Sequence, residues 1–337
     1  MYIFPGAVHK SNWRRLRAES CVLRERGLAE GTWANKVSHL NAYICFTTYF
    51  GVEDFPISRG VLLRFIALLA RGSHAYKSAT NILGSLKYFT SLLDPPSVSV
   101  FENVHVTASL KGLKAQLSRP VRQKLPLSIE HLVKFYNKLD LSVEKQLAGW
   151  CAMLLAFFGC FRLSNLVPSS VIKFDPLKHL RRDDIRFESD MVLIYYKWSK
   201  TNQNCDKVSW IPICPAADPR FNLKTHLELL FEVVRAPASA PLFTFGRGKF
   251  HSRQSLVSLL GNTLASTGLS PSDYSWHSFR RGAAVFAFEL GMADSAVMLL
   301  GDWSSSAFKN YLEFAFIRKV SVAESVTKNF DLYVNKL

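Results

Sequence analysis

The sequence predicts a mainly α protein (α+β) of two domains: a helical N-terminal domain and a mostly helical C-terminal domain that holds a small antiparallel β-sheet. Three observations predict this fold class. Apolar residues recur at three- and four-residue spacing through most of the chain, which is typical of amphipathic helices. Two apolar stretches rich in β-branched and aromatic residues, 191–196 and 208–213, flank a polar segment and predict a β-hairpin. A chain of 337 residues is long for a single core, so two domains are expected.

The N-terminal part, residues 13–94, is expected to fold as about four short helices. The glycines that should separate them are Gly27, Gly31, Gly51 and Gly72. Ser58 and Ser78 each precede an apolar run and are expected to start helices, because a serine side chain can accept a hydrogen bond from the first helical turn. The prolines of 94–97 cannot donate a helix hydrogen bond and should end the last of these helices. Residues 104–118 predict one further helix.

A short basic segment with proline near both ends, residues 119–126, is the best candidate for a linker. We therefore expect an N-terminal domain of residues 1–124 and a C-terminal domain of residues 125–337. The formal net charge is +16 and the isoelectric point is near 9.7, which favours a polyanionic partner. Residues 1–124 hold 17 Lys and Arg against 7 Asp and Glu, a net of +10, which leaves +6 for the rest. This distribution suits a clamp on nucleic acid, with an ordinary solvated basic surface as the alternative.

Composition argues against several other classes of protein. Hydrophobic residues make up 48% and charged residues 20%, so a globular chain is expected. The longest apolar run, 148–160, is shorter than the roughly 20 residues that span a bilayer, and residues 1–10 lack a secretory pattern. The six cysteines show neither a CxxC pattern nor the spacing of a zinc site. Reduced thiols in an intracellular compartment are the simplest interpretation.

The C-terminal domain should begin with a helix from Ser128 through Leu139, followed by a central buried helix over the almost wholly apolar residues 146–158. The predicted β-hairpin comes next, with a long polar tip over residues 197–207. Helical patterns occupy the segments 256–264, 278–290, 295–300, 307–316 and 323–334.

Two cations stand at informative places in this domain. Arg162 comes directly after the most apolar helix, where a guanidinium is costly unless it is paired or directed into a site. The alternative is an arginine that extends to solvent at a helix end. Lys200 stands at the start of the hairpin tip, where a flexible ammonium can contact a ligand, although such tips are often lysine-rich for solubility. Lys197 and Lys207 compete with Lys200 for this role.

Three further groups follow in order along the chain. His277 and Arg280 are three residues apart and should share one face of a helix. Trp303 follows a turn, and Tyr311 lies on the next predicted helix, where a half-buried core tyrosine is the ordinary alternative. A phenol, an imidazole and guanidinium groups are what phosphodiester chemistry through a covalent intermediate needs: a nucleophile, a proton acceptor and cations for the phosphate charge.

Taken together, these motifs resemble the tyrosine recombinase (phage integrase) family. The residues that carry the resemblance are GCFRLSNL around Arg162, SKT around Lys200, WHSFRRGAA around His277 and Arg280, GDW at Trp303 and NYLEF around Tyr311. They span residues 159–314, and the helical basic part before them resembles the SAM-like core-binding domain of that family. The segments around His277 and Tyr311 look most like recombinases of the eukaryotic mobile elements of the Crypton and DIRS kinds.

The resemblance implies a mechanism of strand cleavage and rejoining. Tyr311 would attack the scissile phosphate to form a 3′-phosphotyrosyl link, while Arg162 and Arg280 hold the non-bridging oxygens. His277 would accept the phenolic proton or contact the phosphate, Lys200 would protonate the leaving oxygen, and Trp303 would contact the phosphate. No metal, ATP or other cofactor is implied. The implied partner is double-stranded DNA, bound by a dimer to tetramer of this chain without a membrane, and in the nucleus if the host is eukaryotic.

Two positions depart from the family pattern. The family usually has an acidic residue three positions after its first arginine, where this chain has Asn165. The histidine or tryptophan that the family places nine residues before its tyrosine falls on Asp302, whereas Trp303 lies eight before Tyr311. We favour Trp303 for this role, because an aspartate would repel a phosphate. An inactive DNA-binding protein derived from a mobile element and a type IB topoisomerase-like enzyme are the alternative functions.

Overall fold

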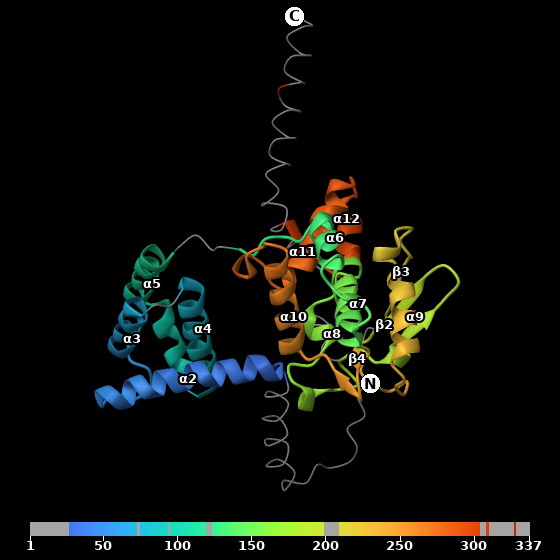
Figure 1. Ribbon diagram of the computed structural model, residues 1–337. Coiled ribbons are helices and arrows are strands. Elements are labelled where there is room, and N and C mark those ends of the chain that lie inside the picture. Colours follow the sequence, from blue (N-terminus) through green and yellow to red (C-terminus); the bar gives the residue numbers. More distant parts are fainter. Residues whose placement is uncertain are drawn as a thin grey trace, which may run out of the picture. The chain divides into compact units, whose positions relative to one another are not determined.

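The computed structural model describes residues 27–72, 75–93, 95–118, 123–198, 209–303, 308–309 and 327 (Figure 1). The chain divides into two units between Arg122 and Gln123. Several sequence predictions fall outside the described residues: Lys200, Lys207, Tyr311, the linker residues 119–122, and nearly all of the helices expected over 307–316 and 323–334.

The first unit is entirely helical in its described part. It consists of α2 (Glu30–Phe50), α3 (Arg59–Arg71), α4 (Tyr76–Leu93), the 3-10 helix η1 (Pro95–Glu102) and α5 (Val104–Leu117). The long α2 packs on α4 and α3, and α3 packs on α5 (Figure 1). Side chains such as Tyr43, Phe65 and Leu86 are buried between these helices and form a core of their own.

Helix boundaries in this unit confirm some sequence predictions and correct others. Ser58 caps α3 by accepting a hydrogen bond from the backbone N–H of Val61, as expected. Gly51 ends α2 in the left-handed conformation, with φ of 62°, which glycine adopts without strain. The prediction that Gly31 separates helices is wrong, because α2 already begins at Glu30. Ser78 does not start a helix either, because α4 begins at Tyr76, whose ring packs against the core and favours an earlier start.

The second unit combines helices with two small sheets. Its α-helices are α6 (Ile129–Tyr136), α7 (Glu144–Phe158), α8 (Leu163–Leu166), α9 (Leu223–Val233), α10 (Arg253–Ser266), α11 (His277–Glu289) and α12 (Asp294–Leu300). Its strands are β1 (Ile185–Phe187), β2 (Val192–Tyr196), β3 (Ser209–Ile213), β4 (Thr244–Phe245) and β5 (Lys249–Phe250). Short 3-10 helices lie at 171–173 (η2), 182–184 (η3), 219–221 (η4) and 271–273 (η5).

The apolar helix α7 forms the centre of this unit, as its sequence predicts. All residues from Leu147 through Phe157 are buried, and α9, α10 and α11 pack on the helix. The predicted β-hairpin is confirmed: β2 and β3 pair antiparallel, with Val192 opposite Ile213 and Tyr196 opposite Ser209. Strand β1 adds to the free edge of β2, so the sheet order is β1-β2-β3. The mainly helical fold with a small antiparallel sheet is therefore the fold that the sequence predicts.

Helix α11 comes unusually close to the segment that precedes α6. A Cβ atom built on Gly282 would lie 1.8 Å from the carbonyl oxygen of Leu127, so only glycine fits there. The backbone N–H of Leu127 donates to the carbonyl oxygen of Ser278 at 3.0 Å, which joins the two segments directly. This close approach sets the position of the helix that carries His277 and Arg280.

Two absences can be stated for the part of the chain that the structure describes. None of its helices combines the length and the apolar character that crossing a membrane would require. The same residues contain no group of three or more His, Cys, Asp or Glu side chains placed to hold a metal ion.

Candidate active site

Arg162 follows a tight turn at the end of α7. Gly159 terminates the helix, and a Cβ atom there would lie 2.5 Å from the ring of Phe161. Cys160 then adopts a left-handed conformation with φ of 51°, which is uncommon for a residue that carries a Cβ atom. The turn buries Phe161 and Leu163 on either side of Arg162, whose own side chain stays partly exposed. The guanidinium is therefore anchored by buried neighbours while it can still reach a ligand.

Arg280 is the best-held cation of the site. Its side chain is 4% exposed, and both terminal nitrogens donate to backbone carbonyls: Nη1 to Cys160 and Nη2 to Gly301. These acceptors lie in the turn after α7 and in the turn after α12, so one guanidinium joins three parts of the fold. Two hydrogen bonds to fixed carbonyls set both the position and the plane of the group.

Trp303 covers this guanidinium. The Cζ atom of Arg280 lies 4.1 Å from the centre of the Trp303 ring, which is a close cation–π contact. The indole is 9% exposed and packs against Gly301, where a Cβ atom would lie 1.9 Å from the ring, and against Phe308 at 5.9 Å between ring centroids. Asp302, at φ of 49°, is exposed at the tip of this turn. The structure thus brings Trp303 onto the arginine.

His277 begins α11 one helical turn before Arg280. The residue is exposed, yet protein atoms packed around the ring lower its pKa from the usual 6.5 to about 4, chiefly by desolvation. The guanidinium charges of Arg280, Arg281 and Arg162 lower the pKa further, in that order. The imidazole is therefore neutral at pH 7 and stands within the electrostatic reach of both site arginines.

The side-chain amide of Asn165 forms a buried hydrogen bond within the fold. The side chain is 3% exposed, and its Nδ2 donates to the carbonyl oxygen of Trp198 at 2.8 Å. Trp198 follows β2, so this bond ties the end of that strand to α8. A carboxylate at this position could not donate a hydrogen bond and would repel the carbonyl oxygen. The departure from an acidic residue thus has a local physical cause.

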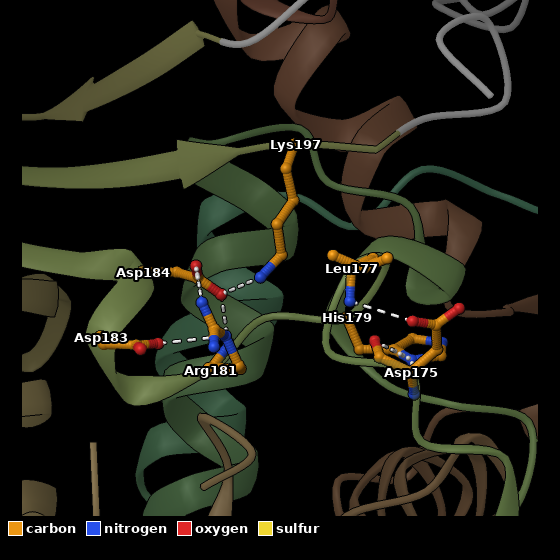
Figure 2. A network of polar contacts seen from close by, with 7 residues as sticks. All are labelled: Asp175, Leu177, His179, Arg181, Asp183, Asp184 and Lys197. Carbon is orange, nitrogen blue, oxygen red and sulfur yellow. Dashed lines mark hydrogen bonds and ion pairs between the residues drawn. The ribbon is translucent and has the colours of Figure 1, made fainter. Parts of the chain in front are cut away.

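Lys197, the alternative to Lys200 in the sequence analysis, forms a buried ion pair. It is buried, and its Nζ lies 2.6 Å from Oδ2 of Asp184, which also accepts a hydrogen bond from the backbone N–H of Arg181 at 2.7 Å. Figure 2 shows Lys197 pointing to Asp184, with Arg181 next to the same carboxylate. Because the ammonium neutralises a buried carboxylate, it is committed to the fold.

The structure therefore brings together Arg162, His277, Arg280 and Trp303 from three segments of the second unit. Lys200 and Tyr311, which the sequence also assigns to the site, lie outside the described residues. The nearest described residues before Tyr311 are Phe308, buried against Trp303, and Lys309, paired with Asp294 at 2.6 Å. Sequence reasoning missed the carbonyls that hold Arg280, because a backbone acceptor leaves no trace in the residue type.

No protein-family model matches this sequence, and no curated protein matches it. Solved structures of similar fold do exist. The Tn1549 transposon integrase in complex with transposon right end DNA has a TM-score of 0.63 at 14% identity, covering 91% of this chain and 96% of that chain. A lambda integrase tetramer bound to a Holliday junction has a TM-score of 0.57 at 18% identity, covering 91% and 82%. The XerH site-specific recombinase bound to palindromic difH substrate has a TM-score of 0.56 at 16% identity, covering 82% and 76%. These likenesses establish a shared fold.

Proposed function

We propose that this protein is a site-specific DNA recombinase of the tyrosine recombinase family, which cuts and rejoins DNA through a 3′-phosphotyrosyl intermediate. The observation that carries the proposal is the setting of Arg280, held by two backbone carbonyls beneath Trp303 and next to a neutral His277. A preorganised guanidinium beside a second arginine is suited to the charge that develops on a phosphate in its transition state. The fold shared with integrases and a site-specific recombinase supports the same function.

In the proposed cleavage step, the phenolic oxygen of Tyr311 attacks the scissile phosphorus and the bond to the 5′ oxygen breaks. The phenolic proton passes to His277, and Lys200 gives a proton to the departing 5′ oxygen. Arg162 and Arg280 hold the non-bridging oxygens throughout. The reverse sequence, with a 5′-hydroxyl of another strand as nucleophile, rejoins the DNA. Because the phosphotyrosyl ester conserves the phosphodiester bond energy, no nucleotide cofactor enters this scheme.

The basicity of His277 depends on the substrate in this mechanism. An imidazole with a pKa of about 4 is a weak acceptor for a phenolic proton, whose own pKa is about 10. A phosphodiester bound between Arg162 and Arg280 brings a negative charge that offsets the guanidinium groups, so the pKa of His277 rises on binding. The base is thereby strengthened only when the scissile phosphate is in place.

We further propose double-stranded DNA as the partner and a dimer to tetramer of this chain on it. Exchange between two duplexes cuts and joins four strands, which requires one nucleophile for each strand. Among the similar structures, lambda integrase is described both as a dimer on a core site and as a tetramer on a Holliday junction. The basic N-terminal domain, residues 1–124, would supply the second half of a clamp around the duplex. A mobile-element recombinase of the Crypton or DIRS kind, acting in a eukaryotic nucleus, fits the sequence resemblance.

Covalent attachment to DNA tests this function. A duplex selected from random sequence by binding to the full chain is nicked near the bound site, so that cleavage releases a short fragment and traps the phosphotyrosyl adduct. We expect an adduct that survives denaturing electrophoresis, and none from Tyr311→Phe. Tyr195→Phe, which alters a tyrosine of the sheet that contacts Trp210, is the matched control and should give the wild-type amount.

The outcomes separate the candidate functions. DNA binding without any adduct from the wild-type chain would indicate the inactive DNA-binding protein instead. An adduct together with relaxation of supercoiled DNA, but without exchange between two duplexes, would indicate the topoisomerase-like enzyme. Equal adduct from wild type and Tyr311→Phe would show that another residue is the nucleophile.

A further inference from the structure

A second cationic pocket lies in the C-terminal unit and shares no residue with the candidate active site. It is a recess of about 290 Å³ between η3, the end of α9 and the loop that follows α9. The lining residues are Arg182, Asp183, Phe231, Arg235, Ala236 and Ala238. Its size suits a small ligand or one terminal group of a larger one.

Arg182 is the unusual residue of this pocket. Its side chain is only 5% exposed, and its guanidinium carbon lies 4.6 Å from the centre of the Phe231 ring. Nitrogens Nε and Nη2 are enclosed, and within the described parts of the chain neither has a hydrogen-bond acceptor. Buried guanidinium donors without acceptors lower stability, because their hydrogen bonds to water are lost and no hydrogen bonds within the protein replace them.

The neighbouring carboxylates do not compensate this charge, because they are committed to other cations. Asp183 lies 3.1 Å from Nε of Arg181. Asp184 lies 2.6 Å from Lys197 and 3.6 Å from Nη2 of Arg181. Figure 2 shows this arrangement, with Arg181 between the two aspartates and Lys197 directed at Asp184. Burial accordingly lowers the pKa of the Arg182 guanidinium from its usual value.

We propose that this pocket binds a single oxyanion, a carboxylate or phosphate group of a small ligand, between Arg182 and Arg235 and against the ring of Phe231. The oxyanion would supply hydrogen-bond acceptors for Nε and Nη2 of Arg182. It would also supply negative charge, because Asp183 and Asp184 pair with other cations. Arg235 adds a second guanidinium at the same recess, and Phe231 with the two alanines forms an apolar wall. This site is independent of the proposed recombinase activity.

The surroundings of the pocket favour a single anion over nucleic acid. Asp183 is one of its lining residues, and α9 also carries Glu228 and Glu232 close to Phe231 in sequence. A DNA backbone would bring a row of phosphates alongside these carboxylates, and like charges repel. One small oxyanion, by contrast, would meet two guanidinium groups and a single carboxylate, that of Asp183, among the residues that line the pocket.

Anion titration of the full chain tests the proposal. Sodium acetate and sodium phosphate each replace sodium chloride at constant ionic strength, and thermal unfolding is followed together with the Nε–Hε signals of ¹⁵N-labelled arginine. At ten times its Kd a ligand multiplies the ratio of folded to unfolded chain about elevenfold, which is roughly 1.4 kcal/mol and a rise in Tm of about 3–6 °C. We expect such a rise, saturable, with acetate, phosphate or both, and a shift of the Arg182 signal. The stronger of the two anions identifies the ligand class.

Arg182→Met retains the length and stacking of the side chain but removes the charge. This variant should unfold at the same or a higher temperature in chloride, because an uncompensated buried charge is gone, and should lose the anion-dependent rise. Arg186→Met is the matched control: Arg186 is an exposed arginine of β1 that lies over Trp210, and its loss should leave the anion response intact.

Three results would overturn the proposal. One is a wild-type chain whose Tm and Arg182 signal respond to neither anion. Another is an anion response that persists in Arg182→Met, which would place the binding elsewhere. The third is a tenfold or larger loss of DNA affinity in Arg182→Met at fixed salt, which would make the pocket part of a nucleic-acid surface.

Discussion

Removal of the Trp303 indole is expected to slow DNA cleavage by releasing Arg280. The indole lies 4.1 Å above a guanidinium that is 4% exposed, so the cation–π contact is largely desolvated and contributes about 2 kcal/mol. If that energy serves to align Arg280 in the transition state, its loss lowers the cleavage rate about 30-fold. Trp303→Phe keeps an aromatic face over the arginine and should lose only about fivefold.

The same substitution also affects folding, and the two effects must be measured separately. Truncation of a buried tryptophan to alanine removes about 3–5 kcal/mol from the free energy of unfolding. Denaturant unfolding followed by circular dichroism measures this loss, and adduct formation on the nicked duplex is then timed where each variant is fully folded. Trp210→Ala is the control, because Arg186 lies over that exposed indole at 5.1 Å and such contacts contribute at most about 1 kcal/mol.

A specific pattern of rates would refute this reasoning. If folded Trp303→Ala forms the adduct as fast as wild type, then the two carbonyl hydrogen bonds alone position Arg280 and the indole only fills space. If Trp210→Ala slows cleavage as much as Trp303→Ala, the effect is a general loss of packing and carries no information on Arg280.

Three further predictions follow from single contacts. Gly282→Ala should cost about 2–4 kcal/mol of stability, because its Cβ atom would lie 1.8 Å from a backbone carbonyl. Gly261→Ala, whose Cβ atom would meet nothing within 4 Å, should stabilise the chain by about 0.5–1 kcal/mol. Denaturant titration of both variants measures these changes. Asn165→Asp should cost about 1–3 kcal/mol at pH 7, because it places a carboxylate against the Trp198 carbonyl. In acid the loss of stability should shrink, since a protonated carboxyl can donate a hydrogen bond to that carbonyl, and unfolding measured at several pH values checks this. For His277, the pKa of about 4 in the folded chain lies below the usual 6.5, so the unfolded chain binds the proton first and the free energy of unfolding falls as pH drops from about 6.5 to 4. His277→Gln should lose less stability than wild type across that interval. If the stabilities of the two chains fall in parallel, the lowered pKa is contradicted.

Much of the fold follows from local patterns. The run of apolar residues over 146–158 predicts a buried helix, and α7 is that helix because no polar residue interrupts it. Two apolar stretches rich in β-branched and aromatic residues on either side of a polar segment predict the pairing of β2 with β3. The sequence analysis did not predict α9, which packs on α7. It also missed the strand β1 and the β4–β5 pair, because strands of two or three residues carry too little pattern to be recognised.

The site residues divide in the same way. Arg162, His277, Arg280 and Trp303 are predicted from the sequence because their motifs follow one another in the order that resembles tyrosine recombinases. The commitment of Lys197 to Asp184, by contrast, joins residues on different elements, and no spacing along the chain predicts it. The hydrogen bond from Asn165 to Trp198 likewise joins two elements, so spacing along the chain does not predict it. It gives the amide, which replaces the acidic residue expected at this position, a partner after β2.

The sequence by itself determined the helical class, the hairpin and the residue types that a phosphate site requires, because each of these depends on side-chain chemistry and periodicity within a short segment. Only the tertiary structure shows that Trp303 lies over Arg280. Spacing from Tyr311 selects the aspartate, but the turn at Gly301 places the indole over Arg280 and leaves the aspartate exposed. The physical reason is that a guanidinium can be held only by groups that meet it in space, and these come from turns 120 and 21 residues away along the chain.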